Sequence, residues 1–462
     1  MAKNANDIVY RDMRYESVKT EYVKVVKFGG SSLADATQFQ KVIEIIRADE
    51  TRRYVVPSAP GKRFDGDFKV TDKLYECYNT AKAGGDFRAV LAVIKARYQD
   101  IIDGLGLSLD LSREFKTIEA VIASGCDSDY VASRGEYLNG IVLAAALGFD
   151  FIDAADVLFF DEEGFLDVYK TQKVMSTVLK LHSHAVIPGF YGARHDGRVK
   201  TFSRGGSDIS GSVVARACDA DLYENWTDVS GFLVADPRIV ENPKTIGVIT
   251  YHELRELSYR GANVLHEDAI FPVRMAGIPI NIRNTNRPED PGTMILAHAD
   301  KSVEAGPITG IAGRCGFSVL TIEKDMMNTQ VGFGRRVLQV FENHGISFEH
   351  LPSGIDSVGV IAATDALSPK RDQVINEICR VVEPDSIQLE EGLALVAVVG
   401  RGMVNRIGTA ARVFSAVAKS GVNIRTIDQG SSEFNIILSV AEKDMTAVIR
   451  AIYDEFYGKD GE

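Results

Sequence analysis

Two patterns of apolar residues, one strand-like and one helix-like, alternate along the chain from Val23 to about Ala299. Short runs rich in β-branched and aromatic residues, typical of buried strands, are separated by segments whose apolar residues recur every three or four positions, as on one face of a helix. This alternation predicts an α/β layer fold with a mainly parallel sheet. The strand-like runs are residues 21–26, 54–56, 120–122, 185–187, 222–226 and 278–282.

The pattern changes near residues 290–307, where two turn-forming sequences, Asp-Pro-Gly and Gly-Pro, interrupt it. Beyond them, a strand, helix and strand order occurs twice, in units of roughly 70 residues. Each helix is followed by a glycine, Gly345 or Gly421, that can adopt the left-handed conformation. The repeat predicts two related α+β domains, although two unrelated modules that pack together would give the same pattern. The strands are expected at residues 317–322, 346–348, 358–362, 393–399, 422–424 and 434–440.

Composition restricts the classes of function. The length of 462 residues predicts two to four domains, and the formal charge of −12 argues against nucleic acid as the main partner. The five cysteines lack the spacing of a zinc site and the even number of a disulfide framework, so we expect a protein of the reducing cytoplasm. The eight histidines form no ligand set, and we expect no metal held by the protein alone. No apolar run has the length of a membrane span, and residues 1–20 lack the apolar core of a signal peptide.

Residues 27–32, Lys-Phe-Gly-Gly-Ser-Ser, link the first strand-like run to a segment with helical periodicity. Glycine lets the main chain approach a ligand oxygen, and the start of a helix presents unpaired N–H groups to an anion. With Lys27 at the same point, the segment predicts a phosphate-binding site. A solvated lysine at the end of a strand is the alternative.

Residues 201–208, Thr-Phe-Ser-Arg-Gly-Gly-Ser-Asp, form a second dense cluster. Ser207 or Asp208 would cap a following helix, whose N-terminus would then face an anion. Arg204 can hold a carboxylate through two hydrogen bonds. A carboxylate beside a phosphate requires a cation, either Mg²⁺ or a lysine, so the combination indicates phosphoryl transfer to a small acid. Simple helix capping is the alternative role of Asp208.

Three further features are compatible with ligand binding. Residues 133–136, Ser-Arg-Gly-Glu, begin a helical stretch, where Glu136 could complement the helix dipole in the first turn or receive a substrate ammonium group. Thr71 could contact a ligand or act as an N-cap. Residues 227–238 follow a strand and place hydroxyl, carboxylate, glycine and guanidinium groups where α/β sheets bind ligands. They could hold a nucleotide, or Arg238 could be a surface arginine in a turn.

These motifs, in this order, resemble those of the aspartokinases over nearly the whole chain: Lys-Phe-Gly-Gly-Ser-Ser, Ser-Arg-Gly-Glu, Ser-Arg-Gly-Gly-Ser-Asp and Trp-Thr-Asp-Val-x-Gly-x-x-x-x-Asp-Pro-Arg. The C-terminal units resemble the ACT domains that bind free amino acids in this family. The resemblance implies an amino acid kinase-type three-layer α/β sandwich and two ferredoxin-like ACT domains, without the homoserine dehydrogenase domain of fused relatives. The implied domains are residues 1–303, residues 315–384, and residues 304–314 together with 385–462.

The resemblance further implies ATP-dependent phosphorylation of the L-aspartate side-chain carboxylate to 4-phospho-L-aspartate, at the head of lysine, threonine and methionine biosynthesis, with Mg²⁺ brought by the nucleotide. Lys27 would neutralise the transferring phosphoryl group, and Asp208 would position the reacting groups or the metal. The residues implied to bind aspartate are Thr71, Glu136, Arg204, Gly205, Gly206 and Ser207. Those implied to bind ATP are Lys27, Gly29, Gly30, Ser31, Thr227, Asp228, Leu233, Arg238 and Asn263.

Two departures from the family pattern affect this assignment. Many relatives carry Lys-Val-Leu-His-Pro after a Gly-Ala pair, whereas residues 261–267 read Gly-Ala-Asn-Val-Leu-His-Glu, so Asn263 offers ATP only a neutral hydrogen bond. Residues 58–71 contain a loop rich in Asp, Gly and Lys that we expect to be mobile.

The resemblance also implies regulation. An inhibitory amino acid, lysine rather than threonine, would bind the first ACT domain at a subunit interface and favour one arrangement of a homodimer or homotetramer over another. Glu349 could pair with its amine. The implied effector-binding residues are Met327, Gly332, Phe333, Ser347, Phe348 and Glu349.

Two other hypotheses remain open at this point. A kinase for glutamate, acetylglutamate or a nucleoside monophosphate would share the fold, but the paired arginine motifs and the ACT domains disfavour it. An amino acid sensor with a degenerate kinase half would agree with Asn263, but Lys27, Arg204 and Asp208 oppose it.

Overall fold

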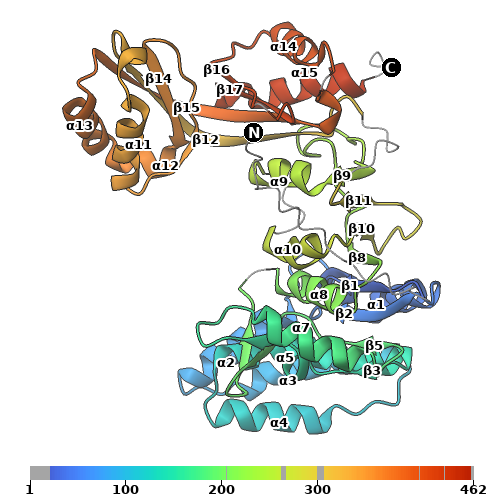
Figure 1. Ribbon diagram of the computed structural model, residues 1–462. Coiled ribbons are helices and arrows are strands. Elements are labelled where there is room, and N and C mark those ends of the chain that lie inside the picture. Colours follow the sequence, from blue (N-terminus) through green and yellow to red (C-terminus); the bar gives the residue numbers. More distant parts are fainter. Residues whose placement is uncertain are drawn as a thin grey trace, which may run out of the picture.

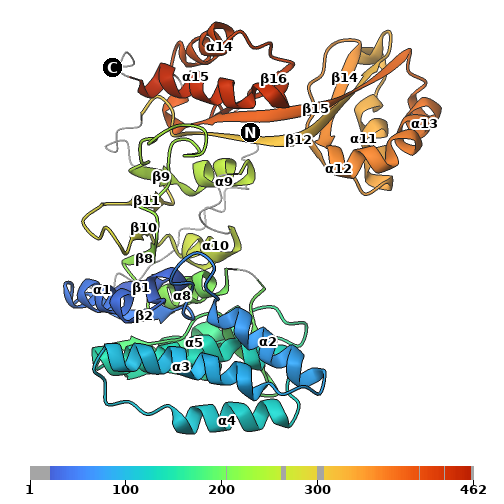
Figure 2. The same cartoon turned by 180° about the vertical axis from the view of Figure 1, so that it is seen from behind.

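The computed structural model describes residues 21–203, 205–261, 267–298, 306–404, 406–430 and 432–458. Figure 1 shows an N-terminal α/β region and, at the opposite end of the molecule, a C-terminal region of two helix-covered lobes. Between them lie the helix α9 (Tyr251–Tyr259) and the strands β9 (Val248–Thr250), β10 (Ile280–Asn284) and β11 (Thr293–Leu296), as the reverse view in Figure 2 also shows.

An eight-stranded sheet is the centre of the N-terminal region, in the order β3-β5-β2-β1-β8-β10-β11-β9. β1 pairs in parallel with β2 and β8, and only the pairing of β10 with β11 is antiparallel among its described neighbours. The prediction of a mainly parallel sheet is therefore confirmed. The strands are β1 Lys24–Phe28, β2 Arg52–Pro57, β3 Asp150–Phe151, β5 Ala185–Val186, β8 Leu222–Thr227, β9 Val248–Thr250, β10 Ile280–Asn284 and β11 Thr293–Leu296. A small separate sheet contains β4 Phe159–Phe160, β6 Tyr191–Arg194 and β7 Val199–Thr201.

Helices cover both faces of the large sheet, so it is the middle of three layers. Val26 and Val55 pack into a core supplied by α1 to α5, whereas their neighbours Val25 and Val56 pack into a second core that includes α6 to α10 and continues into the C-terminal region. This division follows from the alternation of side chains along a strand. The helices are α1 Ala36–Arg47, α2 Val70–Lys82, α3 Arg88–Gly104, α4 Ser112–Ala123, α5 Ser128–Leu147, α6 Ala154–Val157, α7 Val168–Leu179, α8 Gly206–Ala217, α9 Tyr251–Tyr259 and α10 Glu267–Ala276, with the 3₁₀ turn η1 Gly30–Leu33.

The strand expected at residues 120–122 is wrong, because these residues lie in α4. Phe115, Ile118 and Ile122 form the buried face of that helix. A short β-branched run does not distinguish a buried strand from one face of a helix, and here the helical spacing of the buried residues decides.

A six-stranded antiparallel sheet, in the order β13-β14-β12-β15-β17-β16, is shared by the two C-terminal lobes. The long strands β12 and β15 run through both lobes (Figure 1). Gly345 and Gly421 adopt positive φ, as predicted. The predicted domain limits, residues 1–303, residues 315–384, and residues 304–314 together with 385–462, stay a prediction. The elements are β12 Gly310–Glu323, η2 Met327–Thr329, α11 Phe333–Asn343, β13 Phe348–His350, β14 Ser357–Ala363, α12 Thr364–Leu367, η3 Ser368–Lys370, α13 Arg371–Val382, β15 Ser386–Val399, η4 Arg401–Met403, α14 Thr409–Lys419, β16 Thr426–Asp428, β17 Asn435–Ala441, η5 Glu442–Asp444 and α15 Met445–Tyr457.

Glu253 of α9 joins the two regions through a buried carboxylate. Its Oε1 accepts hydrogen bonds from the Thr309 hydroxyl at 2.6 Å and the Arg401 backbone N–H at 2.8 Å, and its Oε2 lies 3.0 Å from the Arg401 guanidinium. Burial alone would raise the pKa of Glu253, but the hydrogen bonds from Thr309, Arg401 and Thr250 outweigh it and the pKa is lowered. Within the described ranges, no helix has the length and apolar character needed to cross a membrane.

Candidate active site

Lys27 and Asp208 form an ion pair at the carboxyl end of the central strands. Lys27 Nζ lies 2.7 Å from Asp208 Oδ1, and Lys27 is only 7% exposed. Asn225, which is opposite Lys27 in the neighbouring strand β8, donates its amide to the same Asp208 oxygen at 2.8 Å. The alternative of a solvated lysine is therefore wrong. The pair supplies the cation that a carboxylate beside a phosphate site requires, and Asn225 is a participant that the sequence analysis missed.

The N-terminus of α8 is built from glycine. Gly205 is the N-cap, with φ of 60°, in the left-handed region that favours glycine, and the helix begins at Gly206. Ser207 and Asp208 are therefore inside the first turn, and the prediction that one of them caps the helix is wrong. The first N–H groups of an α-helix have no partner within it, so this end can bind an anion. Arg204 lies outside the described residues.

Phe190 supports this end of α8 and was also missed from the sequence. Its φ is 77°, which is unusual for a bulky residue, and its N–H donates to the Ser210 hydroxyl at 3.0 Å. A Cβ on the preceding Gly189 would lie 2.7 Å from the Ser207 Cβ, so the two segments are in direct contact. Sparsely populated backbone conformations concentrate at functional sites.

The turn after β1 packs closely against the segment after β2. A Cβ on Gly30 would lie 2.8 Å from the Ala59 carbonyl oxygen, and Gly61 donates its N–H to the Gly30 carbonyl at 2.8 Å. The Gly29 N–H is already bonded to the Trp226 carbonyl at 3.0 Å. The N–H groups that begin η1, those of Gly30 and Ser31, are the ones this turn can offer to phosphate oxygens.

The loop at residues 58–71, expected to be mobile, is anchored at Asp67. The carboxylate is 2.9 Å from Arg63 Nε and 2.8 Å from Arg97 Nη2, and Arg97 and Asp67 are both buried. The Arg63 guanidinium, followed by backbone N–H groups and Arg97, lowers the pKa of Asp67. The loop forms one wall of a cleft of about 530 Å³, which is lined by Gly30, Ser31, residues 58–65, Lys69, Thr71, Glu136, Ser207 and Asp228.

Glu136 is a buried carboxylate that lines this cleft. It lies in the middle of α5, so the alternative role in the first turn of a helix is wrong. None of the described residues hydrogen-bonds its Oε2. Burial raises the pKa of Glu136 to about 8, although hydrogen bonds from backbone N–H groups and the charge of Arg134 oppose the rise. A cation beside Glu136 would favour its ionised form.

Thr71 lines the same cleft. It is the second residue of α2, whose N-cap is Lys69, so the N-cap alternative for Thr71 is wrong. The structure thus brings Thr71, Glu136 and Ser207 to one cleft, from three different helices.

The residues implied to bind ATP extend from this cleft into two adjoining cavities. Asp228 lines both the cleft and a cavity of about 490 Å³ that also contacts Leu233. Leu233 and Arg238 line a third cavity of about 310 Å³ beside β12 and α15. Arg238 is exposed and pairs with Asp236 at 2.6 Å, and the Thr227 hydroxyl donates to Asp228 at 3.2 Å. Asn263 lies outside the described residues.

The residues implied to bind an effector do not all face one side. Met327 and Phe333 are buried in the core of the first C-terminal lobe, with Gly332 as the N-cap of α11. Ser347 and Phe348 are exposed. Glu349 accepts a hydrogen bond from the Tyr259 hydroxyl of α9 at 3.2 Å and lies 3.7 Å from the Arg314 guanidinium.

Comparison with known proteins agrees with this geometry. A model of the amino acid kinase family matches residues 23–284, and an ACT domain model matches residues 396–456. The fold and site thus define an amino acid kinase with a C-terminal ACT region. The chain is 38% identical to Aspartokinase 3 of Bacillus subtilis (strain 168) over 94% of this chain and 99% of that protein. It belongs to the aspartokinases and is an aspartate kinase enzyme, as the motifs predicted.

Two solved structures have the same overall fold. The aspartate kinase of Clostridium acetobutylicum, described as an allosteric enzyme, superposes with a TM-score of 0.85 at 52% identity, covering 94% of this chain and 100% of that one. Aspartokinase III of E. coli, in complex with aspartate and ADP, superposes with a TM-score of 0.68 at 25% identity, covering 94% of this chain and 100% of that one.

Proposed function

We propose that this enzyme transfers the γ-phosphoryl group of ATP to the side-chain carboxylate of L-aspartate, giving 4-phospho-L-aspartate and ADP. The buried carboxylate of Glu136, whose Oε2 has no partner among the described residues, carries the proposal. Such a group is costly to bury unless a cation joins it, and the ammonium group of an amino acid in the cleft would do so. The aspartate and ADP bound to E. coli aspartokinase III are the ligand pair that this assignment requires.

The remaining aspartate contacts follow from that position. Arg204 and the N–H groups at the start of α8, including those of Gly206 and Ser207, would bind the α-carboxylate, because a guanidinium and a helix N-terminus both favour an anion. Thr71 would orient the substrate through its hydroxyl. The reacting carboxylate would then point toward Lys27.

The reaction forms a bond between an aspartate carboxylate oxygen and the γ-phosphorus and breaks the bond from that phosphorus to the leaving oxygen of ADP. A carboxylate nucleophile is already ionised at pH 7, so no general base is needed. Lys27, held in place by Asp208 and Asn225, would neutralise the charge on the transferring group, with help from the N–H groups of Gly30 and Ser31.

Asp208 and Asp228 would hold a Mg²⁺ ion brought by ATP. Mg²⁺ in nucleotide sites is bound by one or two carboxylates together with phosphate oxygens. Asp228 lines the cleft, and Asp208 follows Ser207, which lines it. The ion would shield phosphate charge, while Lys27 and Asn225 keep Asp208 in position.

We also propose that the ACT domains bind an inhibitory end-product amino acid, lysine rather than threonine, in a homodimer or homotetramer. Glu349 supports an amine ligand, because its carboxylate is only 10% exposed. The Tyr259 hydroxyl and the Arg314 guanidinium hold this carboxylate in position. The enzyme would catalyse the first step of lysine, threonine and methionine biosynthesis. We place it in the cytoplasm, since its five cysteines form no disulfide in the described part of the chain.

The test measures ADP release with L-aspartate, L-glutamate, N-acetylglutamate and UMP as acceptors, and traps the acyl phosphate with hydroxylamine. We expect ADP and hydroxamate in equal amounts with aspartate, and neither product with the other acceptors. Turnover with another acceptor, or aspartate binding without ADP release, would contradict the proposal.

A further inference from the structure

A cavity of about 930 Å³ lies in the kinase region apart from the catalytic cleft. It shares no lining residue with the cleft. Its floor includes Ile209, Val213 and Arg216 of α8, and Ile209 is about 200° around the helix from Ser207, which lines the cleft. The two cavities therefore use opposite faces of the same helix.

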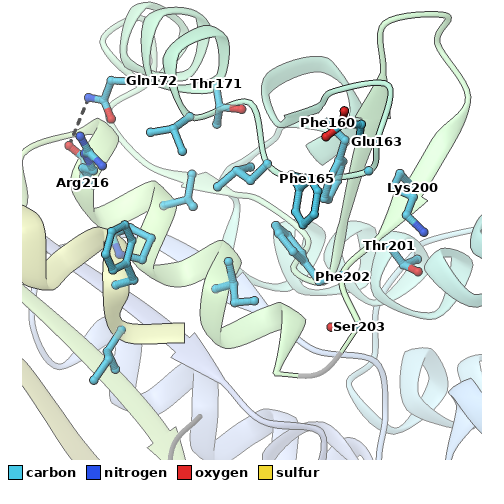
Figure 3. Close-up of a pocket in the computed structure, with 18 of the residues that line it drawn as sticks. Phe160, Glu163, Phe165, Thr171, Gln172, Lys200, Thr201, Phe202, Ser203 and Arg216 are labelled. Carbon is cyan, nitrogen blue, oxygen red and sulfur yellow. Dashed lines mark hydrogen bonds between the residues drawn. The ribbon is translucent and has the colours of Figure 1, made fainter. Parts of the chain in front are cut away.

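The walls of this cavity combine aromatic and aliphatic side chains with polar and charged ones. Figure 3 shows the rings of Phe160, Phe165 and Phe202 beside one another, and Phe271 of α10 contributes a further ring. Phe165 is 68% exposed and Phe271 is 56% exposed, so both present apolar surface to the open space. The volume of about 930 Å³ lies within the range of about 300–1,000 Å³ that is typical of small-molecule sites, where apolar walls carry a few polar groups that orient the ligand.

Charge is unevenly distributed around the cavity. At one end Lys200 pairs with Asp129 at 2.9 Å, and Thr201 donates to the same carboxylate at 2.8 Å, so this end is neutralised. Glu163 lies near this end, and Arg216 lies at the other (Figure 3).

Two arginines line the cavity, Arg216 and Arg274. Arg216 contacts Gln172 only through its backbone carbonyl, which accepts the amide at 3.4 Å. No carboxylate among the described residues forms an ion pair with either guanidinium. An anionic group on a ligand would complement either guanidinium, because guanidinium groups bind carboxylates and related oxyanions strongly.

We propose that this cavity is a second ligand site of the kinase region, which binds a small organic anion with an aromatic or branched apolar body. The body would contact the phenylalanine rings, and the anionic group would bind Arg216 or Arg274. Phe202 and Ser203 line the cavity and directly precede residues 204–207, which are proposed to bind aspartate. Ile209 directly follows Asp208 in α8. The bound ligand would therefore contact the elements that position the reacting groups, independently of the ACT domains.

The test titrates the full-length enzyme with 8-anilinonaphthalene-1-sulfonate, an aromatic anion, and with N-phenyl-1-naphthylamine, which has the same apolar body without the charge. We expect saturable fluorescence from one sulfonate per chain, and about tenfold or more weaker binding of the neutral amine. The double variant Arg216→Glu/Arg274→Glu should weaken sulfonate binding to a similar extent. The control variant Arg371→Glu/Arg380→Glu, which reverses two exposed arginines of α13, should leave it unchanged.

Thermal melts establish that each variant is folded. If Arg216→Glu prevents folding, the single variant Arg274→Glu, at an exposed position, replaces the double variant. Equal affinity for the two probes, or unchanged binding in the charge-reversal variant that folds, would overturn the proposal. Competitive displacement of the sulfonate by saturating L-aspartate and ADP would also overturn it, since the probe would then occupy the catalytic cleft. These readouts measure binding, so they are independent of whether aspartate is phosphorylated.

Discussion

Lys27 Nζ, at the end of β1, lies 2.7 Å from Asp208 Oδ1, in the first turn of α8. Asn225 donates to the same oxygen and so fixes the carboxylate against the lysine. A positive charge that is already held in position needs little reorganisation when negative charge develops on a phosphoryl group. The pair also explains how a carboxylate is tolerated beside the predicted phosphate site.

We expect Lys27→Ala to lower kcat by about a hundredfold to a thousandfold, with a small change in the KM for aspartate, because Lys27 would act mainly on the charge of the transition state. Steady-state kinetics with aspartate and ATP measure this effect. The matched control is Lys24→Ala on the same strand, where the lysine pairs with Asp49. A Lys27→Ala enzyme that retains its kcat would show that this lysine does not stabilise the transferring group.

Glu136 should make aspartate capture depend on pH. Its pKa is raised to about 8 by burial, and the ionised form is the one that attracts an ammonium group, so kcat/KM for aspartate should increase as the pH rises through about 8. Glu136→Gln should remove this dependence and lower kcat/KM. A pH profile of kcat/KM for both enzymes provides the measurement, and an identical profile in the variant would exclude Glu136 as the titrating group.

The same pKa shift predicts a change in stability. A carboxyl group whose pKa is raised in the folded state stabilises the fold in its protonated form, and this contribution is lost progressively as the pH rises from 4.5 to the folded-state pKa of about 8. Glutamine does not titrate. Without substrate, Glu136→Gln should therefore have a free energy of unfolding about 1 to 3 kcal/mol above that of the wild type at pH 9, with a smaller difference at pH 6. Urea denaturation at the two pH values measures the difference, and a variant that is less stable at pH 9 would contradict it.

The fold was predictable where one periodic pattern dominates. The parallel strands and the C-terminal repeat have clear periods, whereas residues 120–122 show that three apolar residues are too few to distinguish a strand from a helix face. In the candidate site, Lys27, Asp208, Glu136 and Thr71 were predicted from motifs, and their alternative roles could be excluded only when helix boundaries and burial were known.

Other parts of the site leave no local signal in the sequence. Asn225 lies within a buried strand, and its role depends on the pairing of β8 with β1. The strained backbone of Phe190 arises from its packing against Gly206 and Ser210, which are distant in sequence. The burial that raises the pKa of Glu136 likewise comes from tertiary packing.

Glu253 should hold the kinase and C-terminal regions together. Its lowered pKa means that the ionised form stabilises the fold, a contribution that is present at neutral pH and lost as the pH falls through and below 4.5. Glu253→Gln should lower the free energy of unfolding at pH 7 by about 3 to 5 kcal/mol, since it leaves the Arg401 guanidinium without its charge partner. Thermal melts at pH 7 and pH 4 measure this, with exposed Glu241→Gln as the control. A difference from the wild type that grows at pH 4 would contradict the assignment.

Tyr259 links the proposed effector site to α9 and should compete with the effector. Its hydroxyl donates to Glu349 at 3.2 Å, so a ligand amine that binds Glu349 must share or replace this hydrogen bond. Tyr259→Phe should therefore lower the lysine concentration for half inhibition by about threefold to tenfold, whereas Glu349→Gln should raise it by a similar factor or more. Inhibition curves at fixed aspartate and ATP provide the measurement, with exposed Tyr169→Phe in α7 as the control. If Glu349→Gln abolishes inhibition while Tyr259→Phe changes nothing, Glu349 binds the effector but the tyrosine does not compete for it. If neither variant alters inhibition by lysine, the effector does not bind at Glu349.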